Sequence, residues 1–264
     1  MAAESLQKET GFHLLKQRVI TRGFLFITLF LLAACHKNKD DQQVSGNNSG
    51  KRLVKITKTK STQTTVFNFT YDASGRLSSM ISNNGEADML FSYDANGNLV
   101  TVEESEPQFT NKWTYTYNNG QLVSATFKDW LKSNGSLNED DSYTYTVSTG
   151  RVTKFLLAMS QSMTVEFTVT YNNDGNVTKV EAPGFLTATF SYGNKKPVYP
   201  IVYKYVTDWA FSPMFFARND LTVQSWDFIG TQNDRTVTMQ YTYDADGYAL
   251  TSTDGSTQYT YQYQ

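Results

Sequence analysis

The chain has 264 residues, with 23 basic and 25 acidic side chains and a net charge of −2. This slightly acidic balance offers no basic face of the kind that binds nucleic acid. The two histidines, His13 and His36, and the single cysteine, Cys35, all lie near the N-terminus, so the rest of the chain cannot supply a Ser/His or Cys/His pair or a His-ligated metal site. We therefore expect no cofactor and no metal.

The N-terminal segment has the pattern of a secretory leader. Its one strongly apolar run, residues 23–34, follows several basic residues, which is typical of signal peptides. About 12 apolar residues are too few for a membrane-spanning helix, which needs roughly 20. We predict a signal peptide over residues 1–34, with a true start that lies downstream, near Val19.

The leader ends in Leu-Ala-Ala-Cys, residues 32–35. This ending resembles the lipobox of bacterial lipoproteins. The resemblance implies that Cys35 carries a lipid and attaches the protein to a membrane, whereas the alternative is a free cysteine in a cleaved leader. Lipidation of Cys35 would also remove what would otherwise be an unpaired reactive thiol in an exported chain.

The residues after the cysteine predict a flexible tether. Residues 35–50 are polar and rich in Gly, Ser and Asn, and such a composition buries too little apolar surface to fold. His36 follows the cysteine in place of Asp, which in lipoprotein sorting permits transfer to the outer membrane. Residues 39–41, Lys-Asp-Asp, resemble an export signal of Bacteroidota surface lipoproteins; ordinary tether charges are the alternative.

One pattern recurs through residues 51–264, which are expected to form a single domain. Tyr-Asp-Ala-Ser-Gly-Arg-Leu at residues 71–77 is matched by Tyr-Asp-Ala-Asn-Gly-Asn-Leu at residues 93–99. Asp or Asn at the start of such a turn accepts a hydrogen bond from the chain two residues on, and Gly supplies the positive φ that closes a hairpin. The expected structural turn glycines are Gly75, Gly97, Gly120, Gly150, Gly175 and Gly247.

The segments between these turns alternate strictly. Phe67, Phe69 and Tyr71 fall on one face, while Asn68 and Thr70 fall on the other. A period of two over many short segments indicates antiparallel strands with one buried face. The fold class that we predict is all-β: an antiparallel meander of hairpins curled into an open or closed barrel-like sheet, with one loop or short-helix insertion.

The Tyr-Asp-x-x-Gly copies resemble the YD-repeats of Rhs and teneurin shells and of small Bacteroidota lipoproteins of unknown function. The resemblance covers residues 52–192 and 236–264. It implies a curled meander and is nearly silent on activity, because the tyrosine and glycine of a YD-repeat build the sheet.

The repeat is interrupted at residues 196–235, which hold three prolines and several aromatic residues. We expect residues 208–218 to form a loop or short helix across the mouth or concave face of the sheet, and residues 221–229 to return as a strand. Rings without a strand pattern to bury them make this insertion either a plug or the wall of a ligand site. The possible ligand-contact residues are Trp209, Phe215, Trp226, Tyr203, Tyr205, Asp208 and Arg218.

Other chemistry has weaker support. Paired carboxylates of the glycosidase type could come from Glu103, Glu104, Glu139, Asp140 and Asp141, but these acids cluster as in solvated loops. The Asp-x-Asp-Gly turn at residues 244–247 lacks the downstream Glu of a calcium loop. Most aromatic residues fall on strand positions that must face a core, so burial is their default explanation. Trp130, Trp209 and Trp226 lie outside the regular turns and are the better candidates for exposure and for stacking on a sugar.

Together these features predict a membrane-anchored outer-membrane or surface lipoprotein that is a non-enzymatic binding or structural module and that faces the periplasm or the cell exterior. Its partners would be the membrane, through Cys35, and an unidentified glycan or other small ligand. The alternatives are a glycan-binding accessory protein or a carboxylate-dependent hydrolase. A transmembrane barrel is disfavoured because the alternating segments have about five to eight residues, where a crossing strand needs roughly 9 to 11.

Overall fold

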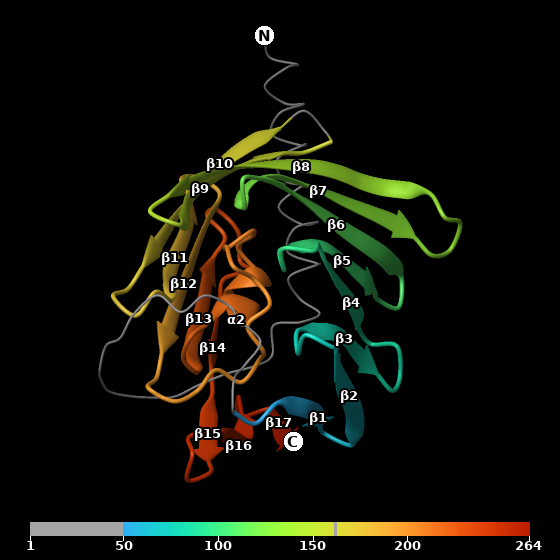
Figure 1. Ribbon diagram of the computed structural model, residues 1–264, viewed down its shortest axis with the longest axis vertical. Helices are drawn as coiled ribbons and strands as arrows, with labels where there is room; N and C mark the ends of the chain where they lie inside the picture. The colour runs from blue at the N-terminus through green and yellow to red at the C-terminus, as the bar shows by residue number, and fades with distance from the viewer. Residues whose placement is uncertain (1–49, 161–162) are drawn as a thin grey trace.

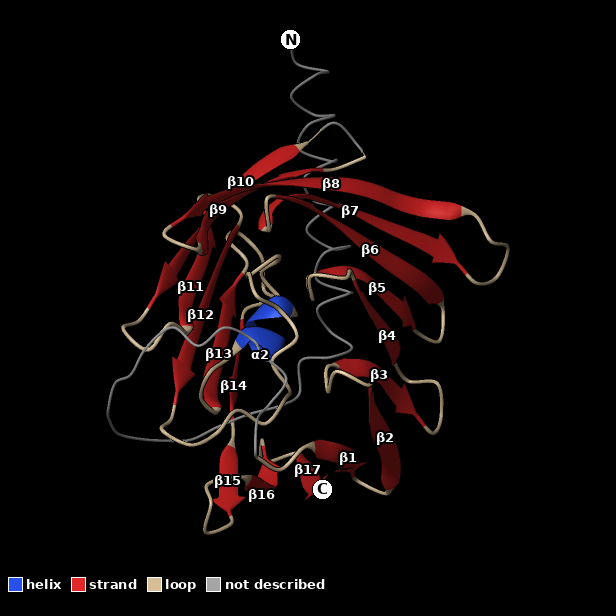
Figure 2. Cartoon of the chain, viewed as in Figure 1, coloured by secondary structure: helices blue, strands red, loops and turns tan. Residues whose placement is uncertain are grey.

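Strands dominate the protein, whose computed structural model describes residues 50–160 and 163–264 (Figures 1 and 2). The predicted signal peptide, Cys35 and the tether up to residue 49 lie outside the described residues. The strands are β1 Leu53–Lys60, β2 Gln63–Tyr71, β3 Leu77–Ser82, β4 Asp88–Tyr93, β5 Leu99–Ser105, β6 Phe109–Asn118, β7 Gln121–Leu131, β8 Leu137–Ser148, β9 Arg151–Ala158, β10 Thr164–Tyr171, β11 Val177–Ala182, β12 Leu186–Tyr192, β13 Leu221–Asp227, β14 Arg235–Thr238, β15 Gln240–Tyr243, β16 Ala249–Thr253 and β17 Thr257–Tyr263, with the helix α2 at Ser212–Phe216.

The strands pair antiparallel in chain order and form a nearly closed barrel. Each strand from β1 to β13 pairs with the next, and β17 pairs with β1 to complete the ring. The seam lies at Met239, which separates β14 from β15: β14 pairs with β13, and β15 pairs with β16. The predicted all-β meander with one short-helix insertion is confirmed, and the ring closes through β1 and β17.

The alternation of side chains places the core inside the barrel. On β2, Phe67 and Phe69 are buried, whereas the alternating residues Asn68 and Thr70 are exposed. Equivalent inward positions on other strands hold Phe91, Phe155 and similar residues. Burying a side chain of this size contributes about 1.5 to 3 kcal/mol, so the inward face supplies the main driving force for folding.

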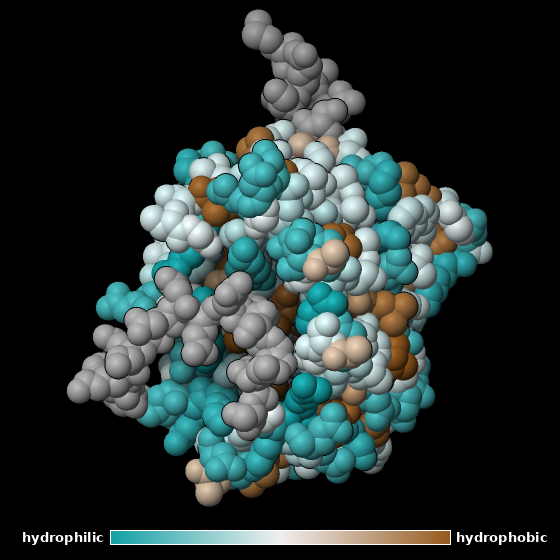
Figure 3. All heavy atoms as spheres, in the orientation of Figure 1, coloured by the Kyte–Doolittle hydropathy of each residue, from teal (hydrophilic) through white to brown (hydrophobic). Residues whose placement is uncertain are grey.

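The outward face is polar and charged. Lys112 lies opposite Glu103 across β6 and β5, and the two form an ion pair; Lys128 and Asp140 pair in the same way across β7 and β8, with Nζ and Oδ2 2.6 Å apart. The surface seen in Figure 3 is mostly hydrophilic. Exposed ion pairs of this kind stabilise little, typically under about 1 kcal/mol, but they show that the wall carries charged side chains outward.

The recurring turns have the geometry that their sequence predicts. Oδ1 of Asp72 accepts hydrogen bonds from the backbone N–H groups of Ser74 and Arg76, both at 2.9 Å. Asp94 and Asp244 cap their own turns in the same pattern. The six glycines expected at turns all have positive φ. Successive turns of an antiparallel meander lie at opposite ends of the strands. The recurring turns are every second turn of the chain, so they lie together at one end of the barrel, called here the YD rim.

The tyrosine of each repeat joins neighbouring hairpins. The hydroxyl of Tyr93 donates to the carbonyl of Leu77 at 2.9 Å, and that of Tyr117 donates to Leu99 at 2.9 Å. In both cases the acceptor is the residue two positions after the preceding turn glycine. A hydrogen bond of this kind contributes about 1 kcal/mol, which explains why the position holds Tyr and not Phe.

The turn between β8 and β9 contains a strained residue. Thr149 has a φ of 48°, and Asn119 has the same φ at the matching position between β6 and β7. A β-branched residue is disfavoured there, whereas Asn tolerates it. We expect Thr149→Asn to raise the free energy of unfolding by about 1 kcal/mol and Tm by about 2 to 4 °C, measured by thermal unfolding. The reverse change, Asn119→Thr, should lower Tm. An unchanged or lower Tm for Thr149→Asn would contradict this assignment.

Candidate functional site

The insertion replaces a turn of the repeat. Tyr192 on β12 pairs with Leu221 on β13, just as Tyr71 pairs with Leu77 across an ordinary turn. The backbone N–H of Gly193 donates to the carbonyl of Asp220 at 2.8 Å and holds the two ends together. The segment between them, residues 193–220, is therefore an enlarged turn at the YD rim.

The enlarged turn folds back into the barrel. Figures 1 and 2 show α2 in the middle of the ring of strands. Phe215 is 1% exposed, and its ring lies 5.9 Å from Phe91 on β4 and 4.9 Å from Tyr199 within the insertion. On the other side, Phe216 contacts Tyr171 of β10 at 6.0 Å. Because it packs against both walls, the insertion acts as a plug.

Most of the predicted ligand-contact residues are buried in or beside this plug. They are Trp209, Phe215, Trp226, Tyr203, Tyr205 and Asp208, while Arg218 is exposed at the rim. Trp226, one of the candidates for exposure, lies on β13 with 1% exposure beneath the guanidinium of Arg235, 4.9 Å from the ring. Trp209 is also buried, against Phe228 at 5.8 Å, and Trp130 is half-buried. The structure therefore gathers these rings into a packed interior.

Asp208 organises the start of α2. Its carboxylate accepts hydrogen bonds from the backbone N–H groups of Ala210 at 2.7 Å, Phe211 at 2.5 Å and Ser212 at 3.1 Å. The Ser212 hydroxyl in turn accepts from the backbone N–H groups of Thr207 and Asp208. Burial raises the pKa of Asp208, and the donated hydrogen bonds act against that rise. The carboxylate thus accepts hydrogen bonds from backbone N–H groups that would otherwise need water as their acceptor.

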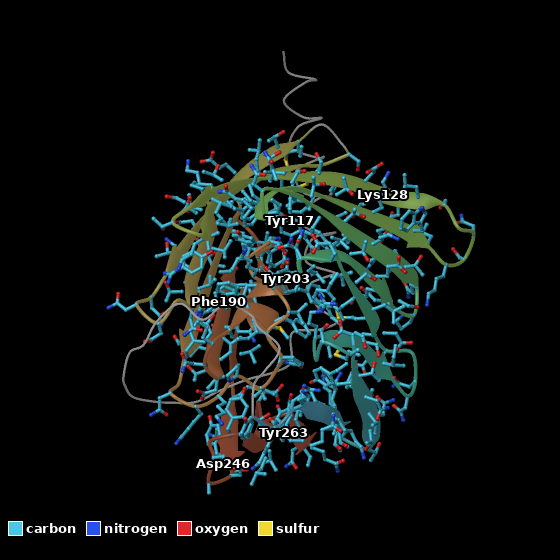
Figure 4. All side chains as sticks on the ribbon, viewed as in Figure 1. Tyr117, Lys128, Phe190, Tyr203, Asp246 and Tyr263 are labelled. Atoms are coloured by element: carbon cyan, nitrogen blue, oxygen red, sulfur yellow. The ribbon has the colours of Figure 1, made fainter. Side chains whose placement is uncertain are left out.

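Buried tyrosines surround this loop. Tyr145 on β8 donates its hydroxyl to the carbonyl of Thr207 at 2.9 Å, and the Tyr115 hydroxyl donates to that of Tyr203 at 3.5 Å. Figure 4 places Tyr203 in the middle of the barrel and Lys128 far out on its wall. Burial raises the pKa values of Tyr145 and Tyr203 well above their usual range. Both phenols are neutral at physiological pH; Tyr145 donates to the loop, and Tyr203 accepts from Tyr115.

Several acids expected in solvated loops lie on strands instead. Glu103 and Asp140 point outward from β5 and β8, but Glu104 is buried. The expectation of a loop was wrong, because these acids lie within the paired strands β5 and β8. Neighbouring residues on a strand point to opposite faces, so Glu103 and Glu104 differ in burial. Glu104 follows Val102 by two residues, so the alternation itself could have revealed its inward direction.

An amide joins two of the inward acids. Nδ2 of Asn111 donates to Glu104 and to Glu106, both at 3.0 Å. Asn111 is 5% exposed and occupies the space between the two carboxylates. A hydrolase needs a substrate or water in that position, so this arrangement is that of a structural network.

The described residues contain no group of acidic, His or Cys side chains that could hold a metal ion. A small cavity beside the plug has room for about one water molecule; its lining comes from Pro197, Val198, Tyr199, Met214, Ala217, Asn219, Leu221 and Tyr241. Among residues 50–160 and 163–264, no helix is long and apolar enough to cross a membrane.

Asp220 is a key residue that the sequence did not reveal. Its Oδ1 accepts the backbone N–H of Lys195 at 2.6 Å, and its Oδ2 accepts the hydroxyl of Tyr243 at 2.6 Å. It therefore ties both ends of the plug to β15. Burial raises the pKa of Asp220, while these hydrogen bonds oppose the rise. Its partners are separated from it by more than 20 residues, so no local pattern marked it.

The sequence matches no protein-family model and no curated protein. Among solved structures, a porin-like protein from Bacteroides vulgatus is similar with a TM-score of 0.41 and 11% identity over 81% of this chain and 99% of that one. A porin-like protein from Bacteroides uniformis has a TM-score of 0.38 and 12% identity, over 81% and 98%. The Tc holotoxin pore of Photorhabdus luminescens has a TM-score of 0.25 and 13% identity, over 71% of this chain and 11% of that one.

Proposed function

We propose that the protein is a lipid-anchored, non-enzymatic binding or structural module of the YD-repeat type, attached through Cys35 to the outer membrane. The lipobox-like ending and the polar tether support the anchor, and the Tyr-Asp turns support the repeat type. In this proposal the barrel stands in water, on the periplasmic side or at the cell surface.

The observation that carries the proposal is the polarity of the barrel wall. A barrel that spans a bilayer presents an apolar band to lipid. Here the outward positions hold ion pairs such as Lys112 with Glu103 and Lys154 with Glu166, and the large apolar residues fill the interior. A wall of this kind favours water, so attachment to the membrane would come from the tether.

The filled interior indicates where such a module would make its contacts. The plug places Trp209, Phe215 and Tyr203 in the core, and Asn111 fills the space between Glu104 and Glu106. Neither arrangement supports a sugar-stacking platform or a hydrolytic pair. Contacts with partners would therefore use the outer wall and the two rims.

The anchor is tested by Cys35→Ser. We expect this variant to lose palmitate labelling and to move from the membrane fraction to the soluble fraction, because the barrel wall is too polar to hold it in a bilayer. A second variant that adds Ser45→Cys to Cys35→Ser restores a thiol away from the lipobox and should remain soluble. Persistent membrane association of Cys35→Ser in low-detergent extracts would refute the proposed anchor.

A further inference from the structure

Basic side chains are distributed around the YD rim, one or more beside most of its turns. Arg52 lies against Gly75, Arg76 against Gly97 and Lys195 against Gly247. Lys204 donates to the carbonyl of Gly120 at 3.4 Å. Arg151 and Arg218 both lie against Gly175. These basic side chains, called here the basic ring, lie at the rim because each one contacts a turn residue.

Tyrosine rings hold several of these cations in place. The guanidinium of Arg76 lies 4.5 Å from the ring centre of Tyr93, and Nζ of Lys196 lies 3.9 Å from that of Tyr248. Cation–π contacts of this type hold the cation at a fixed position. Lys196, like Arg52, Lys204 and Arg218, is exposed, so the ring presents positive charge to the surroundings.

The acids of the same rim are largely committed to local pairs. Asp72 pairs with Arg76 at 2.7 Å, and Lys51 pairs with Asp244 at 2.6 Å and with Asp246 at 2.7 Å. Asp220 is buried. Asp94 caps its own turn, and Asp174 is exposed in the turn between β10 and β11. The outermost charges of the rim are therefore mainly positive.

The opposite rim, formed by the other turns, is closer to neutral among the described residues. Its acids are Glu86, Asp88, Glu106, Asp234 and Asp254, but Glu86 pairs with Lys58 and Glu106 is buried. Its other basic residues are Lys60 and Lys132. Free positive charge is thus concentrated at the YD rim. A protein of this kind turns its basic end toward a negative surface.

The chain that leads to Cys35 also leaves from the YD rim. Gly50 lies against the Tyr248 side chain, and Lys51 is held by Asp244 on the turn after β15. The backbone of Arg52 pairs with Gln264 through hydrogen bonds of 2.8 and 2.9 Å. Figure 4 shows Asp246 at the lower edge of the barrel, on this same hairpin. The described part of the chain therefore begins at this rim and not at the opposite one.

We infer that the basic ring of the YD rim docks on an anionic membrane surface and orients the barrel with its opposite rim pointing away. This inference rests on the proposed lipid anchor. Residues 36–49 at full extension would reach about 50 Å, which by itself permits any orientation. Each cation near an anionic surface favours the docked orientation by about five-fold, so a few exposed cations suffice to select it.

Two single-cysteine reporters test the docking in the full lipidated chain, whose own Cys35 is blocked by the lipid. Asn96→Cys places a fluorophore on a turn of the YD rim, and Ser133→Cys places one on the opposite rim; both positions are exposed. Quenching by a lipid-borne nitroxide is compared in anionic and neutral vesicles. In anionic vesicles we expect several-fold stronger quenching at position 96 than at position 133. At about 0.5 M salt, where the Debye length is a few ångströms, the two positions should be quenched almost equally.

Charge reversal supplies the matched control. Lys196→Glu with Lys204→Glu should lower quenching at position 96 in anionic vesicles, whereas Lys60→Glu with Lys132→Glu at the opposite rim should not. Equal quenching at positions 96 and 133 in vesicle-bound protein would overturn the docking. Failure of the protein to associate with neutral vesicles would instead contradict the lipid anchor, so the two proposals fail separately.

Discussion

Phe215→Ala is expected to lower the free energy of unfolding by about 3 to 5 kcal/mol. Phe215 is the centre of the plug: its ring is 1% exposed and contacts Phe91, Tyr199 and Tyr203, with ring centres 5.9, 4.9 and 6.5 Å away. Truncation would leave a cavity between the plug and the barrel wall, where strand pairing keeps Phe91 on β4 from closing in. Denaturant unfolding followed by tryptophan fluorescence measures the loss.

Leu156→Ala is the matched control for that change. Leu156 is 41% exposed on the outward face of β9, so its truncation should cost well under half as much. If Phe215→Ala unfolds like the wild type while Leu156→Ala is destabilised, the insertion is not a plug. A normally folded Phe215→Ala protein would return the segment to its alternative role as the wall of a ligand site.

Asp208→Ala should destabilise the protein by about 3 kcal/mol or more. The substitution leaves the backbone N–H groups of Ala210, Phe211 and Ser212 without their acceptor inside the barrel, and hydrogen bonds to a charged group contribute about 1.5 to 3 kcal/mol each. Denaturant unfolding again gives the free energy, and Asp94→Ala, on an exposed turn, is the comparison. A loss for Asp208→Ala no larger than that for Asp94→Ala would show that the loop keeps its structure without the carboxylate.

The pH dependence of stability gives Asp208 a second signature. Burial raises the pKa of Asp208 above its ordinary 3.8, so the folded protein binds this proton more tightly than the unfolded chain does. Its contribution to stability is therefore present below pH 4 and is lost as the pH rises through the raised pKa. Asp72, Asp94 and Asp244 have lowered pKa values, and their contribution is lost only as the pH falls below about 3.8. Asp208→Asn should weaken the first dependence, to which Asp220 also contributes because burial raises its pKa, and should leave the second unchanged.

The local pattern of the sequence determined the hairpins. The period of two sets which side chains face inward, so Phe67 and Phe69 point to the core wherever β2 is placed. Asp72 closes its turn through its own backbone, and Gly75 supplies the positive φ. Such interactions span only a few residues, and for that reason the all-β meander and its turns could be predicted from sequence.

Tertiary structure decided how the meander closes and what fills it. The pairing of β1 with β17 joins residues some 200 positions apart, and the seam at Met239 has no local signal. Both candidates for exposure are buried: Trp209 lies in the enlarged turn at residues 193–220, which folds into the ring, and Trp226 packs against Phe190 and Arg235. Asp220 acquires its role only because the fold brings it to Lys195 and to Tyr243 on β15. Long-range contacts of this kind depend on the curvature of the whole sheet, which no single segment of the sequence encodes.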